Sequence, residues 1–426
     1  MENSVKNLIQ FIDHSPSCFH VIENAKKQFL EHGFIQLEEK EHWNLEEGKS
    51  YFVERNGSSM IAFHLPKKDF QGFHIVASHS DSPTYRIKEQ PEMSVEKHYT
   101  KLNIERYGGM IPETWFDRPL SVAGRIIIEE NGQIKDQLVN IDRDLMIIPN
   151  LAIHMSRSSN ESKQLNPQKD LLPLCGGNLT KDGFEEMIAK ESGVEKEDIL
   201  SYDLFLYNRM RGTTLGINEE FVAAPKLDDL ECAYSSIEGM LNAKLSKDYV
   251  TVCALFDNEE VGSGTKQGAG STFFPEVLKR ISYLCGKNEE EYYMAVADSF
   301  MLSADNAHAV HPNYQDKTDP TNRPYINEGI VLKYNASQKY TTDANSAALV
   351  KYLCKKEKIK CQVFFNRSDM LGGSTLGNIL TGQVSIKAAD IGLPQLSMHS
   401  TYETAGCKDL DDMITLMGSF YELGKE

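Results

Sequence analysis

The spacing of apolar positions divides the chain into two outer segments that alternate strands with helices and a middle segment of strand-like runs. Short apolar runs bounded by polar turns predict buried strands, and apolar residues at helical spacing predict helices between them. The strands predicted in this way are 74–77, 250–256, 292–300, 361–365 and 387–391. The helices are 5–12, 18–32, 227–241, 275–285, 340–354 and 409–423. This alternation favours an α/β domain with a mostly parallel, doubly wound sheet.

The middle of the chain has a different pattern. Runs such as LSVAGRIIIEE alternate apolar and polar positions around an Asn131-Gly132 turn, which predicts antiparallel strands. We therefore expect a β-rich domain at 91–224 that is inserted into a discontinuous α/β domain made of 1–90 and 225–426.

Acidic and histidine side chains follow the predicted strands. The stretch VTVCALFDNEEVGSGT runs from a buried strand into Glu259 and Glu260, whose like charges need an offset such as a divalent cation. His79 and Asp81 follow the strand at 74–77, so a histidine ligand has a carboxylate partner nearby. Taken singly, these pairs also fit an ordinary turn at the surface.

The predicted fold would bring these acidic and histidine residues to one place, so together they indicate a metal site more strongly than each does alone. In open α/β sheets, ligands bind beyond the carboxyl ends of the strands. Two histidines and three carboxylates at that edge can hold two divalent ions, with one carboxylate bridging, and such a set suits zinc, manganese or cobalt. The residues that lie after a predicted strand or at a helix start are His79, Asp228, Glu259, Glu260, Asp305 and His399.

Composition narrows the classes of partner. With 45 basic and 62 acidic residues the net charge is −17, which argues against nucleic acid or an anionic membrane as partner. The sequence shows no signal peptide and no apolar run of membrane-spanning length. Its eight cysteines form no Cys-x-x-Cys pair, as expected of reduced thiols in a cytoplasmic protein.

Eight ordered motifs resemble those of the aspartyl-aminopeptidase-type family, which includes the yeast-type vacuolar aminopeptidase. They are SHSDSP, YGGMIPETWFDRPLSVAGR, IPNLAIH, APKLDDL, FDNEEVGS, SADNAHAVHPNY, GGSTLGNIL and DIGLPQLSMHSTYE, and they extend over nearly the whole chain. The resemblance implies a dinuclear metallo-aminopeptidase, with zinc as the expected metal and manganese or cobalt as alternatives. It also implies a tetrahedral dodecamer built from dimers, in which the inserted domain makes subunit contacts.

The resemblance also assigns roles to residues of this chain. Asp228 would bridge two ions, His79 and Asp305 would complete one site, and Glu260 and His399 would complete the other. Glu259 would be the general base, and Asp81 would orient His79. His154 would reach into the active site of a neighbouring subunit and stabilise the tetrahedral intermediate.

Two positions depart from the family pattern, because Asp229 stands where Asn is common and Ser80 stands where Thr is common. Neither change removes a ligand, and the extra carboxylate at 229 leaves the identity of the metal open.

The function predicted is hydrolysis of the N-terminal residue from peptides through a water that bridges two divalent ions. One alternative is a metal-dependent deacylase or carboxypeptidase-like amidohydrolase, which would need a basic clamp that the sequence does not mark. Another is a non-catalytic assembly protein, which would be expected to have lost Glu259 or a ligand. The preferred N-terminal residue is not specified by these motifs.

Overall fold

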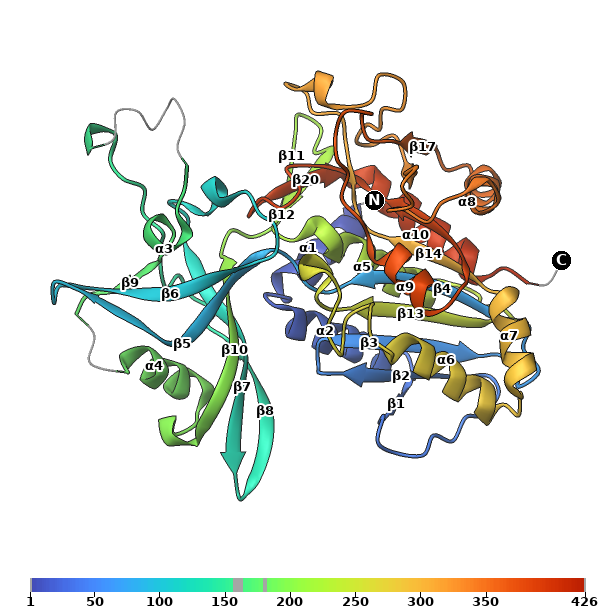
Figure 1. Cartoon of the computed structure of the whole chain (residues 1–426), viewed down its shortest axis with the longest axis horizontal. Helices are drawn as coiled ribbons and strands as arrows, with labels where there is room; N and C mark the ends of the chain where they lie inside the picture. The colour runs from blue at the N-terminus through green and yellow to red at the C-terminus, as the bar shows by residue number, and fades with distance from the viewer. Residues whose placement is uncertain (1, 156–163, 179–181, 425–426) are drawn as a thin grey trace.

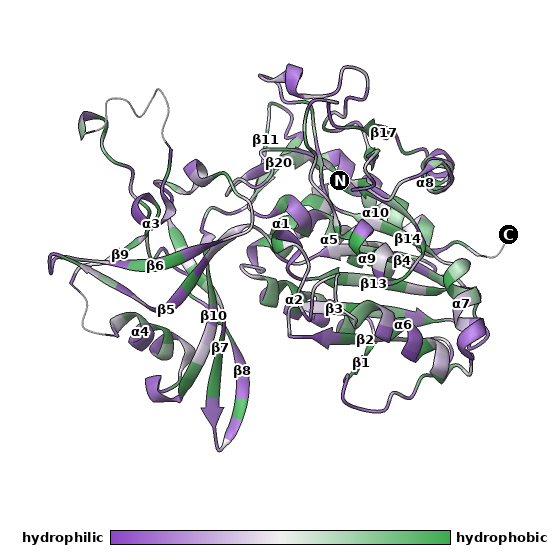
Figure 2. Cartoon of the chain, viewed as in Figure 1, coloured by the Kyte–Doolittle hydropathy of each residue, from purple (hydrophilic) through white to green (hydrophobic). Residues whose placement is uncertain are grey.

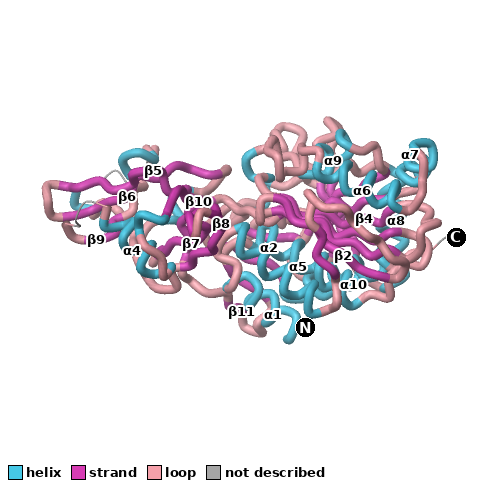
Figure 3. Tube along the Cα trace, turned by 90° about the horizontal axis from the view of Figure 1, so that it is seen from below, coloured by secondary structure: helices cyan, strands magenta, loops and turns pink. Residues whose placement is uncertain are grey.

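The computed structural model describes residues 2–155, 164–178 and 182–424. Two lobes lie side by side, one built on a nine-stranded sheet and the other on a six-stranded antiparallel sheet (Figures 1 and 3). Within the described residues, no helix is both long enough and apolar enough to cross a membrane.

The nine-stranded sheet forms the centre of the larger lobe. Its middle strands β13, β4, β14 and β18 are mutually parallel, with Cys253 paired to Val76 and Leu302 also paired to Val76. All seven residues of β13 are buried, as expected for a strand covered on both faces. In spatial order the strands are β1 (Ile35–Leu37), β2 (Lys49–Arg55), β3 (Ser59–Leu65), β13 (Val250–Phe256), β4 (Phe73–His79), β14 (Phe300–Ala304), β18 (Lys387–Gly392), β16 (Ile330–Lys333) and β17 (Cys361–Phe364).

Helices cover both faces of this sheet, and each face has its own apolar core. One face packs against α1 (Glu2–Asp13), α2 (Cys18–Glu31), α5 (Leu227–Asn242), α8 (Ala344–Glu357) and α10 (Cys407–Tyr421). The other packs against α6 (Phe273–Leu284), α7 (Glu289–Ala297) and α9 (Leu376–Gln383). Figure 2 shows the strands between these two layers as mostly hydrophobic. The predicted doubly wound, mostly parallel sheet is therefore confirmed.

The second lobe is a separate antiparallel β domain, as the predicted fold class requires. Its antiparallel sheet consists, in spatial order, of β8 (Gln133–Asn140), β7 (Leu120–Glu130), β10 (Ile199–Asn208), β5 (Thr84–Val95), β6 (Tyr99–Tyr107) and β9 (Leu174–Gly176). Two helices, α3 (Pro167–Asp170) and α4 (Gly183–Ser192), accompany it. A separate apolar core, which includes Trp115, Leu120 and Leu204, holds this lobe together.

A small third sheet lies next to the edge where the parallel strands end. It consists of β11 (Thr213–Leu215), β12 (Phe221–Ala224), β20 (Glu403–Gly406), β19 (Pro394–Leu396) and β15 (Ala307–His308). Because β12 leads into α5 and β19 leads toward β20 through residues 397–402, this sheet carries two segments of the site described below.

The strand predicted at 292–300 is wrong. That stretch belongs to α7, and the strand β14 begins only at Phe300. The Asn288 side chain caps α7 in a capping box with Glu291, and Tyr292 and Ala295 are buried at helical spacing. A local cap therefore overrides the apolar run that resembled a strand.

Candidate active site

The ends of three neighbouring strands deliver the predicted residues to one edge of the sheet. His79 is the last residue of β4, and Asp305 follows the end of β14 directly. Glu259 and Glu260 lie in η5 (Glu259–Val261), which is separated from the end of β13 by two residues. These strands are parallel neighbours, so their carboxyl ends meet at the same place.

Asp228 lies at the centre of the cluster. Its Oδ1 lies 3.5 Å from Nε2 of His79, and its Oδ2 lies 3.1 Å from Nε2 of His399. Nε2 of His399 also lies 3.4 Å from Oε2 of Glu260. The side chains of Asp228 and Glu260 are each only 3% exposed. One carboxylate therefore presents its two oxygens to two different histidines.

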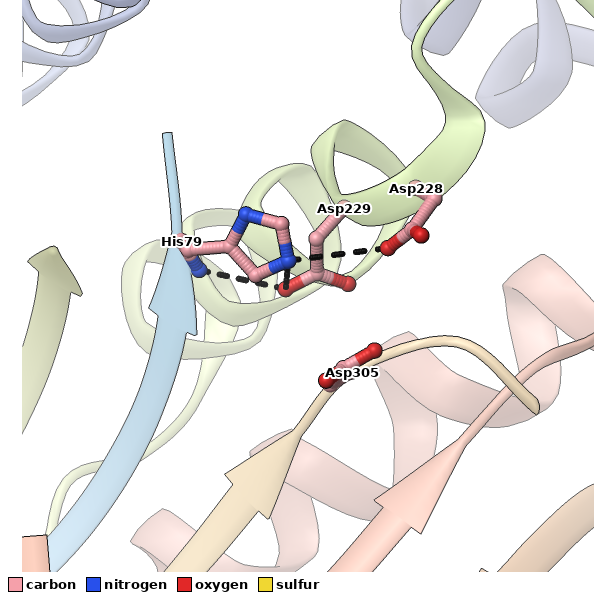
Figure 4. Close-up of side chains that lie close together, drawn as sticks. All are labelled: His79, Asp228, Asp229 and Asp305. Carbon is pink, nitrogen blue, oxygen red and sulfur yellow. Dashed lines mark hydrogen bonds and ion pairs between the residues drawn. The ribbon is translucent and has the colours of Figure 1, made fainter. Parts of the chain in front are cut away.

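Asp229 joins the cluster from the next position on α5. The backbone N–H of His79 donates to Oδ2 of Asp229 at 3.1 Å, and Figure 4 shows both aspartates facing His79 with Asp305 opposite. Ligand atoms of His79, Asp228, Asp229 and Asp305 all lie within 4.8 Å of one another. Asp229 is completely buried, so its carboxylate belongs to the interior of the site.

Asp81 organises the other side of His79. It lies 3.3 Å from Nδ1 of His79 through Oδ1, and its two oxygens accept the backbone N–H groups of Glu259 and Glu260 at 3.1 and 3.2 Å. The hydroxyl of Tyr107, at the end of β6, donates to Asp81 at 2.6 Å. One buried carboxylate thus fixes a histidine ring and both adjacent glutamates.

Glu403 makes a second arrangement of this kind. Its Oε1 accepts the N–H of His399 at 2.7 Å and its Oε2 accepts the N–H of Asp228 at 2.9 Å.

Gly108 lies next to Glu260. It has a φ of +78°, and a Cβ there would lie 3.1 Å from Cβ of Glu260. A glycine is therefore required where the inserted lobe passes the site.

The pKa values of the cluster are shifted because several carboxylates are buried close together. Burial raises the pKa of Glu259 to about 8 and that of Glu260 well above its ordinary range, and neighbouring carboxylates add to this. Burial alone would lower the pKa of His79, but Asp229, Asp228 and Asp81 raise it well above its ordinary value. Burial would raise the pKa of Asp228, yet the nearby imidazoles of His399 and His79 hold it well below its ordinary value.

These residues fit a divalent cation. Oδ1 of Asp228 and Oε1 of Glu260 are buried and have no hydrogen-bond partner among the described residues. Buried carboxylate oxygens normally have a partner, and a bound ion is one reason for an orphaned oxygen. A set of histidine and carboxylate donors, with no cysteine among the clustered groups, is the set that zinc accepts in enzymes.

The structure brings together His79, Asp81, Asp228, Glu259, Glu260, Asp305 and His399. It leaves His154 outside this cluster, exposed in η2 (Ile153–Met155). Sequence reasoning missed Tyr107 and Glu403. Both occur within the motifs quoted above, but neither has a spacing that would indicate contact with the site.

Comparison with known proteins identifies the family. The sequence model described as "Aminopeptidase I zinc metalloprotease (M18)" matches residues 11–421. A "Probable M18 family aminopeptidase 2" of Clostridium acetobutylicum is 45% identical over 431 residues, which cover 98% of each chain. The chain belongs to the M18 aminopeptidase family.

M18 structures share this fold over the whole chain. "Crystal structure of yeast aminopeptidase 1 (Ape1)" has a TM-score of 0.85 at 27% identity, covering 99% of this chain and 97% of that chain. "Structure of S. cerevesiae mApe1 dodecamer" has a TM-score of 0.86 at 27% identity, with the same coverage. The M18 chain described here is thus an aminopeptidase and a zinc metalloprotease, and the predicted family and enzyme class are confirmed.

Proposed function

We propose that this M18 aminopeptidase holds two divalent cations and uses them to remove the N-terminal residue of peptides. The position of Asp228 carries the proposal, because its two oxygens face two histidines at 3.5 and 3.1 Å. Asp228 would bridge the two cations. His79 and Asp305 would be the other ligands of one cation, and Glu260 and His399 those of the second. Zinc is the cation that the family description supports, and manganese and cobalt are alternatives.

Bound cations of this kind act as Lewis acids toward a carbonyl oxygen and make water a stronger acid. Glu259 would be the general base, taking a proton from the attacking water and delivering it to the leaving amine nitrogen. Its place supports this role, because its ligand atoms cluster with those of His79 and Glu260 and its backbone N–H is held by Asp81. Asp81 would keep His79 in orientation through Nδ1.

His154 would act in the active site of a neighbouring subunit, where it would bind substrate and stabilise the oxyanion. Its exposure in η2, away from the cluster in its own chain, supports this. We propose that this chain also forms a dodecamer, the assembly named for S. cerevisiae mApe1, and that it is tetrahedral and built from dimers.

Residues 91–224 would form the oligomerisation domain, and 1–90 with 225–426 the catalytic domain. The separate apolar cores of the two lobes support a division into two domains, although Tyr85 belongs to the core of the smaller lobe and Val222 to that of the larger lobe. A cytoplasmic location is proposed because all eight cysteines, each in a described part of the chain, are free thiols. With a net charge of −17, neither nucleic acid nor a membrane is expected as a partner.

The test is hydrolysis of a panel of aminoacyl-anilides by the purified protein, combined with metal analysis before and after chelation. We expect two equivalents of cation per chain, chelator-sensitive release, and recovery when zinc is added back. The ranking within the panel identifies the preferred N-terminal residue. One equivalent in the fully active enzyme would refute the dinuclear site, and cleavage of N-acylated substrates alone would favour a deacylase.

A further inference from the structure

Glu403 lies behind the site rather than in it. It is the first residue of β20, is 1% exposed, and is absent from every group of side chains whose ligand atoms cluster around a cation position. Its two carboxylate oxygens each accept one backbone N–H, from His399 at 2.7 Å and from Asp228 at 2.9 Å. The two residues that share this acceptor are 171 positions apart in the chain, from 228 to 399.

Both donors belong to backbone that regular structure does not support. His399 has a φ of +65°, and Asp228 has a non-helical φ and ψ of −83° and 105° at the start of α5. Within the described chain, the structure gives neither N–H an acceptor other than Glu403. The N–H of Asp228 is buried and that of His399 is partly buried, and an N–H shielded from water without an acceptor is unfavourable. These two conformations therefore depend on this carboxylate.

We propose that Glu403 is a positioning residue for the metal site, holding the backbone of Asp228 and His399 so that their side chains meet at one cation. The proposal rests on the assignment of Asp228 and His399 as ligands. The 3.1 Å approach of His399 Nε2 to Asp228 Oδ2 is the geometry that Glu403 maintains. Glu403 does not contact His79 or Asp305 through any hydrogen bond described, so the cation at His399 is the one affected first.

Contacts from the inserted lobe hold the same turn from its other side. Ile111 donates its N–H to the carbonyl of His399 at 3.0 Å, and Thr401 donates its hydroxyl to the carbonyl of Thr114 at 2.7 Å. The turn is therefore clamped between η1 (Pro112–Trp115) with its preceding residue and the Glu403 carboxylate. If the Glu403 contacts are lost, the contacts from the inserted lobe still hold the turn, although it can shift. We therefore expect a variant at Glu403 to fold.

The variant to test is Glu403→Gln, because an amide can accept only one of the two N–H groups and turns a donor toward the other. Asp409→Asn is the matched control. Asp409 is likewise buried and accepts two backbone N–H groups, from Asn327 at 2.6 Å and Gly329 at 2.8 Å, and within the described chain no hydrogen bond or ion pair joins it to the cluster. Both variants lose the same kind of structural bond, and only Glu403→Gln disturbs ligand backbone.

Zinc affinity is measured on the full-length protein by competition with a chromogenic chelator, and ligand geometry by the visible absorption of the cobalt-loaded protein. We expect Glu403→Gln to bind one of two cations about 10–100-fold more weakly, with an altered cobalt spectrum and a fall in kcat larger than any rise in KM. Asp409→Asn should match the parent in all three. Glu403→Asp, which keeps the charge but is one methylene shorter, should show the same loss and serves if the glutamine variant does not fold.

Parent-like zinc affinity and cobalt spectrum in Glu403→Gln would overturn the proposal, as would an equal loss in Asp409→Asn. His399→Ala separates this failure from failure of the ligand assignment. If that variant loses one cation while Glu403→Gln is parent-like, only the positioning role is wrong. If His399→Ala also binds both cations with parent affinity, the ligand assignment itself is wrong.

Discussion

The hydroxyl of Tyr107 links the inserted lobe to the active site, and Tyr107→Phe removes that hydroxyl alone. It donates to Oδ2 of Asp81 at 2.6 Å and accepts from Nδ2 of Asn258 at 2.8 Å. The ring itself packs edge-on against Phe205 with centroids 5.7 Å apart, and phenylalanine keeps that contact. The substitution therefore tests two hydrogen bonds without opening a cavity.

The expected loss follows from those two bonds. A hydrogen bond to a charged group contributes roughly 1.5–3 kcal/mol, and a buried donor left without a partner costs about 1–3 kcal/mol. Tyr107 is half-buried and Asp81 keeps its other donors, so we expect a local loss of about 2 kcal/mol. Because the same carboxylate holds the N–H groups of Glu259 and Glu260, the loss falls on the segment that carries the proposed base.

Hydrogen exchange measured by mass spectrometry on a peptide spanning 257–262 is the assay. A loss of about 2 kcal/mol corresponds to roughly 30-fold faster exchange there, and zinc affinity should fall about tenfold. A peptide from α8 should exchange at the parent rate. Tyr293→Phe is the control, since within the described chain its hydroxyl, on an exposed side chain, has a hydrogen bond to Glu289 alone. Parent-like exchange at 257–262 together with parent-like zinc affinity would refute the view that Tyr107 holds Asp81.

Three further predictions concern the base, the neighbouring subunit and acid stability. Glu259→Gln should retain zinc and fold while kcat falls about 10²–10⁴-fold, and normal turnover would remove the role of Glu259. His154→Phe should lower kcat in the assembled enzyme without changing its zinc content, and a fully active variant would show that subunits do not share sites. Burial lowers the pKa of His74 to about 4, so between pH 6.5 and 4 the unfolded chain binds the proton more readily and stability decreases as the pH falls. In His74→Phe the ring can still stack on Tyr249, whose centroid lies 4.0 Å away. Urea unfolding at pH 7 and pH 4 should show that this variant loses about 3 kcal/mol less unfolding free energy on acidification than the parent. The control His32→Gln, at an exposed site, should not reduce that loss.

Much of the fold follows from local pattern. The apolar run 250–256 coincides with β13, and the amphipathic spacing at 5–12 and 409–423 lies within α1 and α10 apart from the last two residues. Such elements are readable because burial on one or both faces imposes a period that the sequence must carry. The strand predicted at 292–300 failed because a capping box, a local hydrogen-bonded signal, decided for helix α7 instead.

Part of the candidate site could also be predicted from the sequence. Residues just after parallel strands could be expected to converge, since the sheet itself brings strand ends together, and His79, Glu260 and Asp305 do lie at one edge. Asp228 and His399 belong to the same predicted set, and the family motifs assign both as ligands. Sequence alone thus determined which side chains to look for and at which edge of the sheet.

Tertiary structure alone decided how those side chains are held. Only the folded structure shows that the two oxygens of Asp228 face different histidines. The same is true of the bond from Tyr107, in the other lobe, to Asp81, and of the two bonds by which Glu403 joins His399 to Asp228. Four of these contacts join residues 26 to 175 positions apart, and the fifth, from His399 to Glu403, spans four positions within an irregular turn. None of them follows from the periodicity of a helix or a strand. Hydrogen bonds of this range form only after the strands and loops have packed, so their partners cannot be recognised from the pattern of one segment.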